Sequence, residues 1–337
     1  MRMLRPPMMR QGLVMGLGMA RVQSAAAAGE PGIDWTIRTS AADNGWNSVA
    51  WAPSIPLFAA VSSSGTADRV MTSPDGITWT SRTPTSLSYN SVAWSPELSL
   101  FVAVASSGTG NRVATSPDGI TWTSRTSAAN NSWRSVAWSP SLTLFVAVAS
   151  SGVGNRVMTS PDGIAWTIRT SAADNGWQGV TWSPELALFV AVATSGTGNR
   201  VMTSPDGINW TIRTSAADNS WNSVAWSPSL TLFAAVSSTG TGDRVMTSPD
   251  GINWTIRTSA VDNSWRGVTW APELSLFCAV GSDNLGDGVM TSPDGITWTA
   301  RTSPGTNNWQ SVAWAPALSK FAAVASSGTG DRVMTSP

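Results

Sequence analysis

A four-residue string, Ser-Pro-Asp-Gly, recurs along the chain at an almost constant interval. Its copies begin at Ser73, Ser116, Ser160, Ser204, Ser248 and Ser292, which gives intervals of 43, 44, 44, 44 and 44 residues. A seventh copy is divided between the chain ends: Ser336-Pro337 supplies its start, and 32–36 supplies its continuation. Units of this length bury their apolar surface against their neighbours, so the repeat fixes the architecture. Residues 32–337 therefore contain seven units of about 44 residues.

Each unit contains four short runs that are typical of β-strands. In one intact unit these are 164–169, 177–182, 188–192 and 200–203. All are rich in β-branched and aromatic residues, and Gly, Pro, Ser or Asn bounds them. The Ser-Pro-Asp-Gly string predicts a hairpin, because Pro presets φ, Asp bonds locally and Gly accepts a left-handed conformation.

Four-stranded units at this period predict an all-β fold, a seven-bladed β-propeller of four-stranded antiparallel blades. The N-terminal run 33–38 is expected to pair with the C-terminal blade, whose other runs lie within 309–335. That pairing closes the ring and removes exposed strand edges. An open solenoid of the same units is the alternative.

Residues 1–31 lie outside the repeat, so we predict two parts: a leader (1–31) and the propeller (32–337). The leader has a basic start, a short apolar patch and an Ala run, which is compatible with a signal peptide, a transit peptide or a disordered segment. Export is favoured among these. No apolar run approaches the ~20 residues that span a membrane, so no membrane span is expected.

The composition excludes several classes of chemistry. The chain has no His and one Cys, Cys278, so a Ser-His-Asp relay, a Cys-His relay and a thiolate zinc cluster cannot be built. Its formal net charge is zero, which argues against broad attraction to nucleic acid. The spacing of Asp and Asn resembles neither an EF-hand nor the RTX nonapeptide. We therefore predict no metal, no cofactor and no nucleic-acid partner, and we expect a monomer.

The 20 Trp and the single Tyr fill three fixed positions in each of the seven units. The turn tryptophans follow the string: Trp35, Trp79, Trp122, Trp166, Trp210, Trp254 and Trp298. The entry aromatics begin the next run: Trp46, Tyr89, Trp133, Trp177, Trp221, Trp265 and Trp309. The exit tryptophans end that run: Trp51, Trp94, Trp138, Trp182, Trp226, Trp270 and Trp314. Packing between blades explains the turn and exit sets, whereas the entry aromatics lie where a polar loop meets the blade and are open to ligand contact. In a regular strand, entry and exit positions would face opposite sides.

The string with its following Trp, Ser-Pro-Asp-Gly-Ile-Thr-Trp, resembles the Asp-box or BNR repeat of sialidase-like propellers. That motif runs Ser-x-Asp-x-Gly-x-x-Trp, so this chain carries a shortened variant with Asp and Gly adjacent. The resemblance covers about nine tenths of the chain. It implies a structural role, in which the Asp ties the hairpin, for Asp75, Asp118, Asp162, Asp206, Asp250 and Asp294.

The same resemblance raises a sialidase-like glycoside hydrolase as the alternative function. Such an enzyme needs an arginine triad, a Tyr nucleophile with a Glu partner, and an Asp acid/base. Here the only Tyr occupies a Trp position, and Glu97, Glu185 and Glu273 share one repeated turn. A catalytic centre needs unlike groups converging on one point. Near-identical units supply equivalent environments instead, so we predict that the protein is not an enzyme.

One face of the propeller is expected to gather the entry aromatics with a set of loop arginines. These are Arg69, Arg112, Arg156, Arg200, Arg244 and Arg332. Aromatic rings beside Arg, Asp and Asn suit a sugar, although turn capping and ion pairing between blades would explain the polar residues equally well. We predict a scaffold or lectin-like protein that binds glycans or another protein through this loop face.

Overall fold

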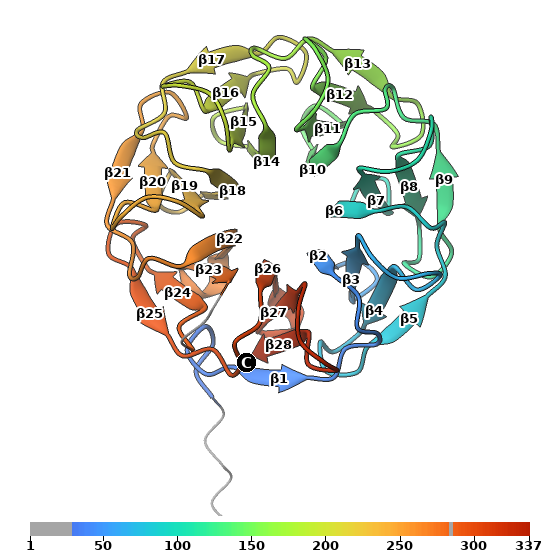
Figure 1. Cartoon of the computed structure of the whole chain (residues 1–337), viewed down its shortest axis with the longest axis vertical. Helices are drawn as coiled ribbons and strands as arrows, with labels where there is room; N and C mark the ends of the chain where they lie inside the picture. Colours follow the sequence, from blue (N-terminus) through green and yellow to red (C-terminus); the bar gives the residue numbers. More distant parts are fainter. Residues whose placement is uncertain (1–28, 283–285) are drawn as a thin grey trace, which may run out of the picture.

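The computed structural model describes residues 29–282 and 286–337, which form seven four-stranded antiparallel sheets around a central channel (Figure 1). The predicted seven-bladed propeller is confirmed. The leader prediction falls mainly on residues 1–28, which lie outside the described residues. Within the described residues, no helix is long and apolar enough to cross a membrane.

In six of the blades the strands run in chain order from the channel outward, and in the seventh the N-terminal strand lies outermost. The first blade contains β2 (Trp46–Ala52), β3 (Leu57–Ser62), β4 (Val70–Ser73) and β5 (Thr80–Arg82). The second contains β6 (Tyr89–Ser95), β7 (Leu100–Ala105), β8 (Val113–Ser116) and β9 (Thr123–Arg125). The third contains β10 (Trp133–Ser139), β11 (Leu144–Ala149), β12 (Val157–Ser160) and β13 (Thr167–Arg169). The fourth contains β14 (Trp177–Ser183), β15 (Leu188–Ala193), β16 (Val201–Ser204) and β17 (Thr211–Arg213).

The remaining blades follow the same plan. The fifth contains β18 (Trp221–Ser227), β19 (Leu232–Ser237), β20 (Val245–Ser248) and β21 (Thr255–Arg257). The sixth contains β22 (Ser264–Ala271), β23 (Leu276–Ser282), β24 (Val289–Ser292) and β25 (Thr299–Arg301). The seventh contains β26 (Trp309–Ala315), β27 (Lys320–Ala325) and β28 (Val333–Ser336), with β1 (Thr36–Arg38) outermost. Short 3-10 turns, η1 (Pro272–Leu274) and η2 (Pro316–Leu318), follow β22 and β26.

The two chain ends close the ring as the sequence predicts. Strand β1 pairs antiparallel with β28, with Thr36 opposite Thr335. The divided turn also reforms without a covalent link, because the Gly32 amide donates to the Ser336 hydroxyl at 2.7 Å. In an intact turn the Gly76 amide donates to the Ser73 hydroxyl at 2.8 Å. The seventh blade therefore keeps an amide–hydroxyl bond that also closes an intact turn.

The outer strands are shorter than the sequence predicts. The run 164–169 forms a strand only from Thr167 to Arg169, and Trp166 lies in the turn before it. Gly163 has a φ of +72°, and the Asp162 carboxylate accepts two backbone N–H bonds from Ile164 and Ala165. These bonds hold the first residues of the run in the turn, so they cannot pair with β12.

A β-bulge interrupts every innermost strand directly after the entry aromatic. In the first blade Trp46 lies opposite Ser62, and the next pair is Ser48 with Val61, so Asn47 is the extra residue. The extra residue shifts the alternation by one position. The entry and exit tryptophans therefore lie on the same face of the blade. The expectation that they face opposite sides was wrong, because the strand is bulged and not regular.

Blades pack by setting a face of large residues against a face of small ones. In the first blade Trp46, Trp51, Phe58 and Met71 form one cluster. The seventh blade presents Ala313, Ala322 and Val324 to the same cluster. Within each blade the exit tryptophan contacts the Phe opposite it, with Trp51 and Phe58 centroids 4.6 Å apart. Such aromatic pairs contribute about 0.5–1.5 kcal/mol beyond their buried area.

Candidate functional site

The entry aromatics are buried completely in the described structure. Trp46 and its five Trp equivalents have no exposed area, and neither does Tyr89. Five of the six indoles also donate to a backbone carbonyl, as Trp46 Nε1 does to Ala42 at 3.0 Å. A ligand has no ring face to stack on here. Trp46, Tyr89, Trp133, Trp177, Trp221, Trp265 and Trp309 are therefore packing residues in this structure.

The loop arginines tie together the loops between blades. Arg156 Nε donates to the Gly152 carbonyl at 2.8 Å and lies 3.5 Å from the Asp174 carboxylate. Asp174 also accepts the Gly154 amide at 2.7 Å. The same ion pair joins Arg200 to Asp218, Arg244 to Asp262 and Arg332 to Asp43. Arg69 and Arg112 keep the bond to the loop carbonyl, on Gly65 and Gly108 respectively. Four of the six arginines therefore pair with an aspartate, and all six donate to a carbonyl of their own loop.

The six string aspartates hold their own turns. Asp75 Oδ1 accepts the amides of Ile77 and Thr78, both at 2.8 Å, and the Ser73 hydroxyl at 2.9 Å. The following Trp79 indole donates to the Gly76 carbonyl at 2.9 Å. Burial alone would raise the pKa of Asp75, but these hydrogen bonds outweigh it and lower the pKa. Asp118, Asp162, Asp206, Asp250 and Asp294 make the corresponding bonds.

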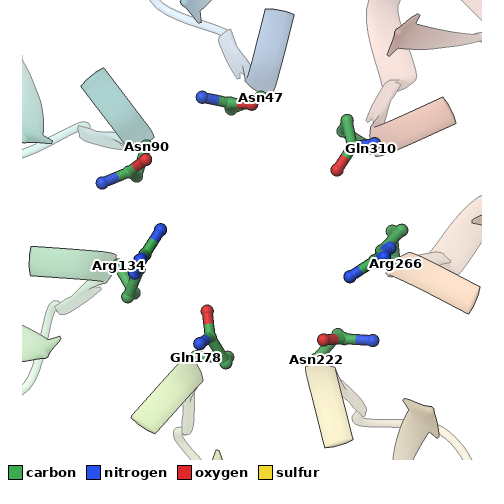
Figure 2. A pocket seen from close by; sticks show the side chains of 7 residues that line it. All are labelled: Asn47, Asn90, Arg134, Gln178, Asn222, Arg266 and Gln310. Carbon is green, nitrogen blue, oxygen red and sulfur yellow. The ribbon is translucent and has the colours of Figure 1, made fainter. Parts of the chain in front are cut away.

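The bulged residues converge at one end of the channel. They are Asn47, Asn90, Arg134, Gln178, Asn222, Arg266 and Gln310, and we call them the polar ring (Figure 2). They line a cavity of about 200 Å³. In the first and third blades, for example, the entry aromatic pairs with the last residue of the second strand. The polar ring therefore lies at the end of the channel where the loops between the second and third strands are found.

The polar ring was not predicted from sequence, although a signal for it exists. Across the seven units, this position takes three residue types, Asn, Arg and Gln, whereas every other position of the innermost strand takes at most two. It is also the position that the bulge leaves unpaired. The structure thus places the most variable residue of a nearly invariant strand at the channel opening.

The amides of the polar ring partly tether the blades to each other. Asn47 Nδ2 donates to the Tyr89 carbonyl at 2.9 Å, and Asn90 Nδ2 donates to the Trp133 carbonyl at 2.7 Å. Asn222 repeats the bond to Trp265. Each of these bonds uses the amide nitrogen and leaves the amide oxygen as an acceptor. The asparagines therefore position the ring while keeping hydrogen-bonding capacity at the channel.

The two arginines break the sevenfold similarity of the ring. Arg134 lies on β10 and Arg266 on β22, and they face each other across the opening (Figure 2). None of the seven lining side chains is acidic. Arg134 Nε donates to the Ser150 hydroxyl at 2.9 Å, whereas Arg266 Nε is buried without a hydrogen-bond partner. Burial lowers the pKa of both guanidinium groups.

Comparisons with known proteins support the fold and nothing finer. Searches found no matching family model and no matching curated protein. A streptogramin B lyase structure has a TM-score of 0.72 at 5% identity, covering 90% of this chain and 97% of that one. A chain of a mitotic checkpoint complex has a TM-score of 0.65 at 14% identity, covering 96% and 97%.

A third similar structure is the Cps50 (Swd1) β-propeller domain of Myceliophteria thermophila. It has a TM-score of 0.65 at 13% identity, covering 90% of this chain and all of that domain. The chain is a seven-bladed β-propeller. At these identities the shared fold says nothing about what the chain binds.

The exit tryptophans lie at the end of the innermost strands opposite the polar ring, and their indole N–H groups have a partner in only three of the seven described blades. Trp138 donates to Glu97 at 2.6 Å and Trp314 to Glu273 at 2.7 Å, and Trp226 pairs likewise with Glu185. Each Glu comes from the preceding blade. Trp51, Trp94, Trp182 and Trp270 have a buried Nε1 without a partner. Their preceding blades carry Ala317, Ser54, Ser141 and Ser229 where the others carry Glu.

Proposed function

We propose that this protein is a non-enzymatic, lectin-like binding protein whose polar ring holds one small hydroxyl-rich ligand. The observation that carries the proposal is the convergence of seven polar side chains on one cavity of about 200 Å³. Drug-sized sites occupy about 300–1,000 Å³, so a smaller ligand such as a monosaccharide fits this volume. The proposed site lies on the same loop face that the sequence predicts. The ligand-contacting residues are the polar ring at the channel opening and not the entry aromatics.

The chemistry of the ring suits hydroxyl groups. Asn and Gln each offer an acceptor oxygen and donor hydrogens, which match a hydroxyl that both donates and accepts. The Gln178 side chain makes no hydrogen bond within the described residues, so both its amide oxygen and its amide nitrogen are available to a ligand. The bonds from Asn47, Asn90 and Asn222 to backbone carbonyls fix these three side-chain amides in place. A preorganised ring of this kind binds without first losing side-chain freedom.

The positions of the candidate catalytic groups favour binding over glycoside hydrolysis. Tyr89 is fully buried, and burial raises its pKa to about 12, although the hydrogen bond to Thr85 lowers it in part. A nucleophile needs access and an activated oxygen. Glu97 and its equivalents bond the exit tryptophans at the far end of the channel, away from the polar ring. Within residues 29–282 and 286–337, Tyr89 and these glutamates lie at opposite ends of the innermost strands and do not form a nucleophile with an acid/base partner.

Isothermal titration calorimetry with a panel of monosaccharides tests the proposal. We expect a stoichiometry of one ligand per chain, because there is one ring. Gln178→Phe should fill the cavity and abolish binding, whereas Ile168→Phe, on the exposed face of β13, should leave it unchanged. A silent panel, a stoichiometry near seven, or unchanged binding by Gln178→Phe would each overturn the proposal.

A further inference from the structure

The polar ring concentrates positive charge in a protein that has no net charge. The chain has 20 Lys and Arg against 20 Asp and Glu, yet the seven side chains at the channel opening include two arginines and no carboxylate. Four loop arginines, Arg156, Arg200, Arg244 and Arg332, each lie within 4 Å of an aspartate. Arg134 and Arg266 belong to none of these four pairs in the described structure.

Burial makes the missing counter-charge significant. Charged groups in partly desolvated sites gain stability from a partner, and an unpaired donor there carries a desolvation penalty. Arg266 Nε is such a donor, because it is buried and has no hydrogen-bond partner. Arg134 differs, since the Ser150 hydroxyl already accepts from its Nε. An incoming anion would supply the missing hydrogen-bond acceptor for Arg266 Nε, whereas Arg134 Nε already has one.

The other units show that this position does not require arginine. Gln178 and Gln310 occupy it in the fourth and seventh blades, and Asn occupies it in three more. The fold therefore accepts a neutral amide in all five of those blades. The two guanidinium groups, three blades apart and facing each other, add charge and planar donors that blade packing does not need.

We propose that the ligand of the polar ring is an acidic sugar, whose carboxylate is bound by Arg266 with Arg134 facing it across the channel. This inference rests on the proposed binding function and specifies its ligand. Guanidinium groups bind carboxylates through charge-assisted, often bidentate hydrogen bonds. The five amides then bind the hydroxyl groups of the same molecule.

Calorimetry with glucuronate, glucose and sulfate, at low and at 0.3 M sodium chloride, tests the inference. We expect glucuronate to bind at least tenfold more tightly than glucose and more weakly at high salt. Arg266→Gln should weaken glucuronate binding roughly ten- to a hundredfold, and Arg134→Gln should have a smaller effect. Both variants recreate a residue that other blades carry, and Arg213→Gln, on the outermost strand β17, is the matched control that removes one charge away from the ring.

The outcomes separate the two proposals. Equal affinity for glucose and glucuronate, or an Arg266→Gln variant that binds glucuronate normally, overturns the acidic-sugar inference and leaves the binding function standing. Sulfate binding as tightly as glucuronate supports the arginine site and contradicts a sugar ligand. Failure of all three titrants, with circular dichroism showing a folded protein, overturns both.

Discussion

The alternating Glu–Trp bonds at the far end of the channel allow stability to be added by design. Trp182 Nε1 is buried without a partner, and the preceding blade has Ser141 where Glu97 bonds Trp138 at 2.6 Å. Ser141→Glu should supply the missing acceptor. A hydrogen bond to a charged group contributes about 1.5–3 kcal/mol, and ordering an exposed Glu side chain costs up to about 2 kcal/mol. We expect a net gain of about 1 kcal/mol.

The effect should add across blades because the sites do not touch. Ser54, Ser141 and Ser229 precede Trp94, Trp182 and Trp270 respectively, and each belongs to a different blade. Replacing all three with Glu should stabilise the protein by about 3 kcal/mol. At about 2.1 cal/mol/K per residue, the unfolding entropy of a propeller of roughly 300 residues converts this gain to a Tm rise of about 5 °C.

Urea unfolding and calorimetry measure this gain, and a double-mutant cycle assigns it. Trp182→Phe removes the indole N–H, so Ser141→Glu should add nothing in that background. Glu97→Ser should lower the free energy of unfolding by about 1 kcal/mol, because it leaves the Trp138 indole N–H without an acceptor, as in Trp182. Equal stabilisation by Ser141→Glu with Trp182 and with Phe at that position would refute the hydrogen-bond argument.

Three further outcomes follow from the fold. The six turn aspartates have lowered pKa values: burial opposes the shift, but backbone and side-chain hydrogen bonds bring Asp206 and Asp250 to about 2. Their contribution is present above the unfolded pKa near 4 and is lost as pH falls toward 2, so the urea midpoint should drop across that range and stay flat if the aspartates contribute nothing. Tyr89 should titrate near pH 12 in the native protein and near 10 in urea, with stability falling between these values; tyrosinate absorbance checks this, and a native value near 10 would contradict its burial. Deleting residues 1–38 removes β1 and exposes the β28 edge, so size-exclusion chromatography should show self-association, and an unchanged monomer would argue that the edge is harmless.

The repeat was enough to predict the architecture, because its period, strand composition and divided seventh unit all point to one closed ring. The tryptophan positions were also readable as packing residues. The β-bulge was not, because a seven-residue strand such as 46–52 reads as regular alternation and its extra residue has no distinctive type. The bulge nevertheless decides both which face Trp46 occupies and which residue reaches the channel.

The sequence-based site prediction followed residue type, whereas the proposed polar ring is marked by variation between units. Trp46 and its equivalents drew attention as aromatics, yet near-invariance across units is what a packing interface requires. Asn47, Arg134 and Gln178 occupy the one position of this strand that takes three residue types, and they line the cavity. That variation was visible in the sequence, but only the structure shows that the seven residues meet.

We infer that the ligand site lies in the polar ring and is lined by Arg134 and Arg266. A crystal structure of the protein with glucuronate would show where the sugar binds. We expect one sugar at the channel opening, with its carboxylate within hydrogen-bond distance of Arg266 and its hydroxyls on the ring amides. Density for the sugar on the outer loops, with the channel opening unoccupied, would contradict it.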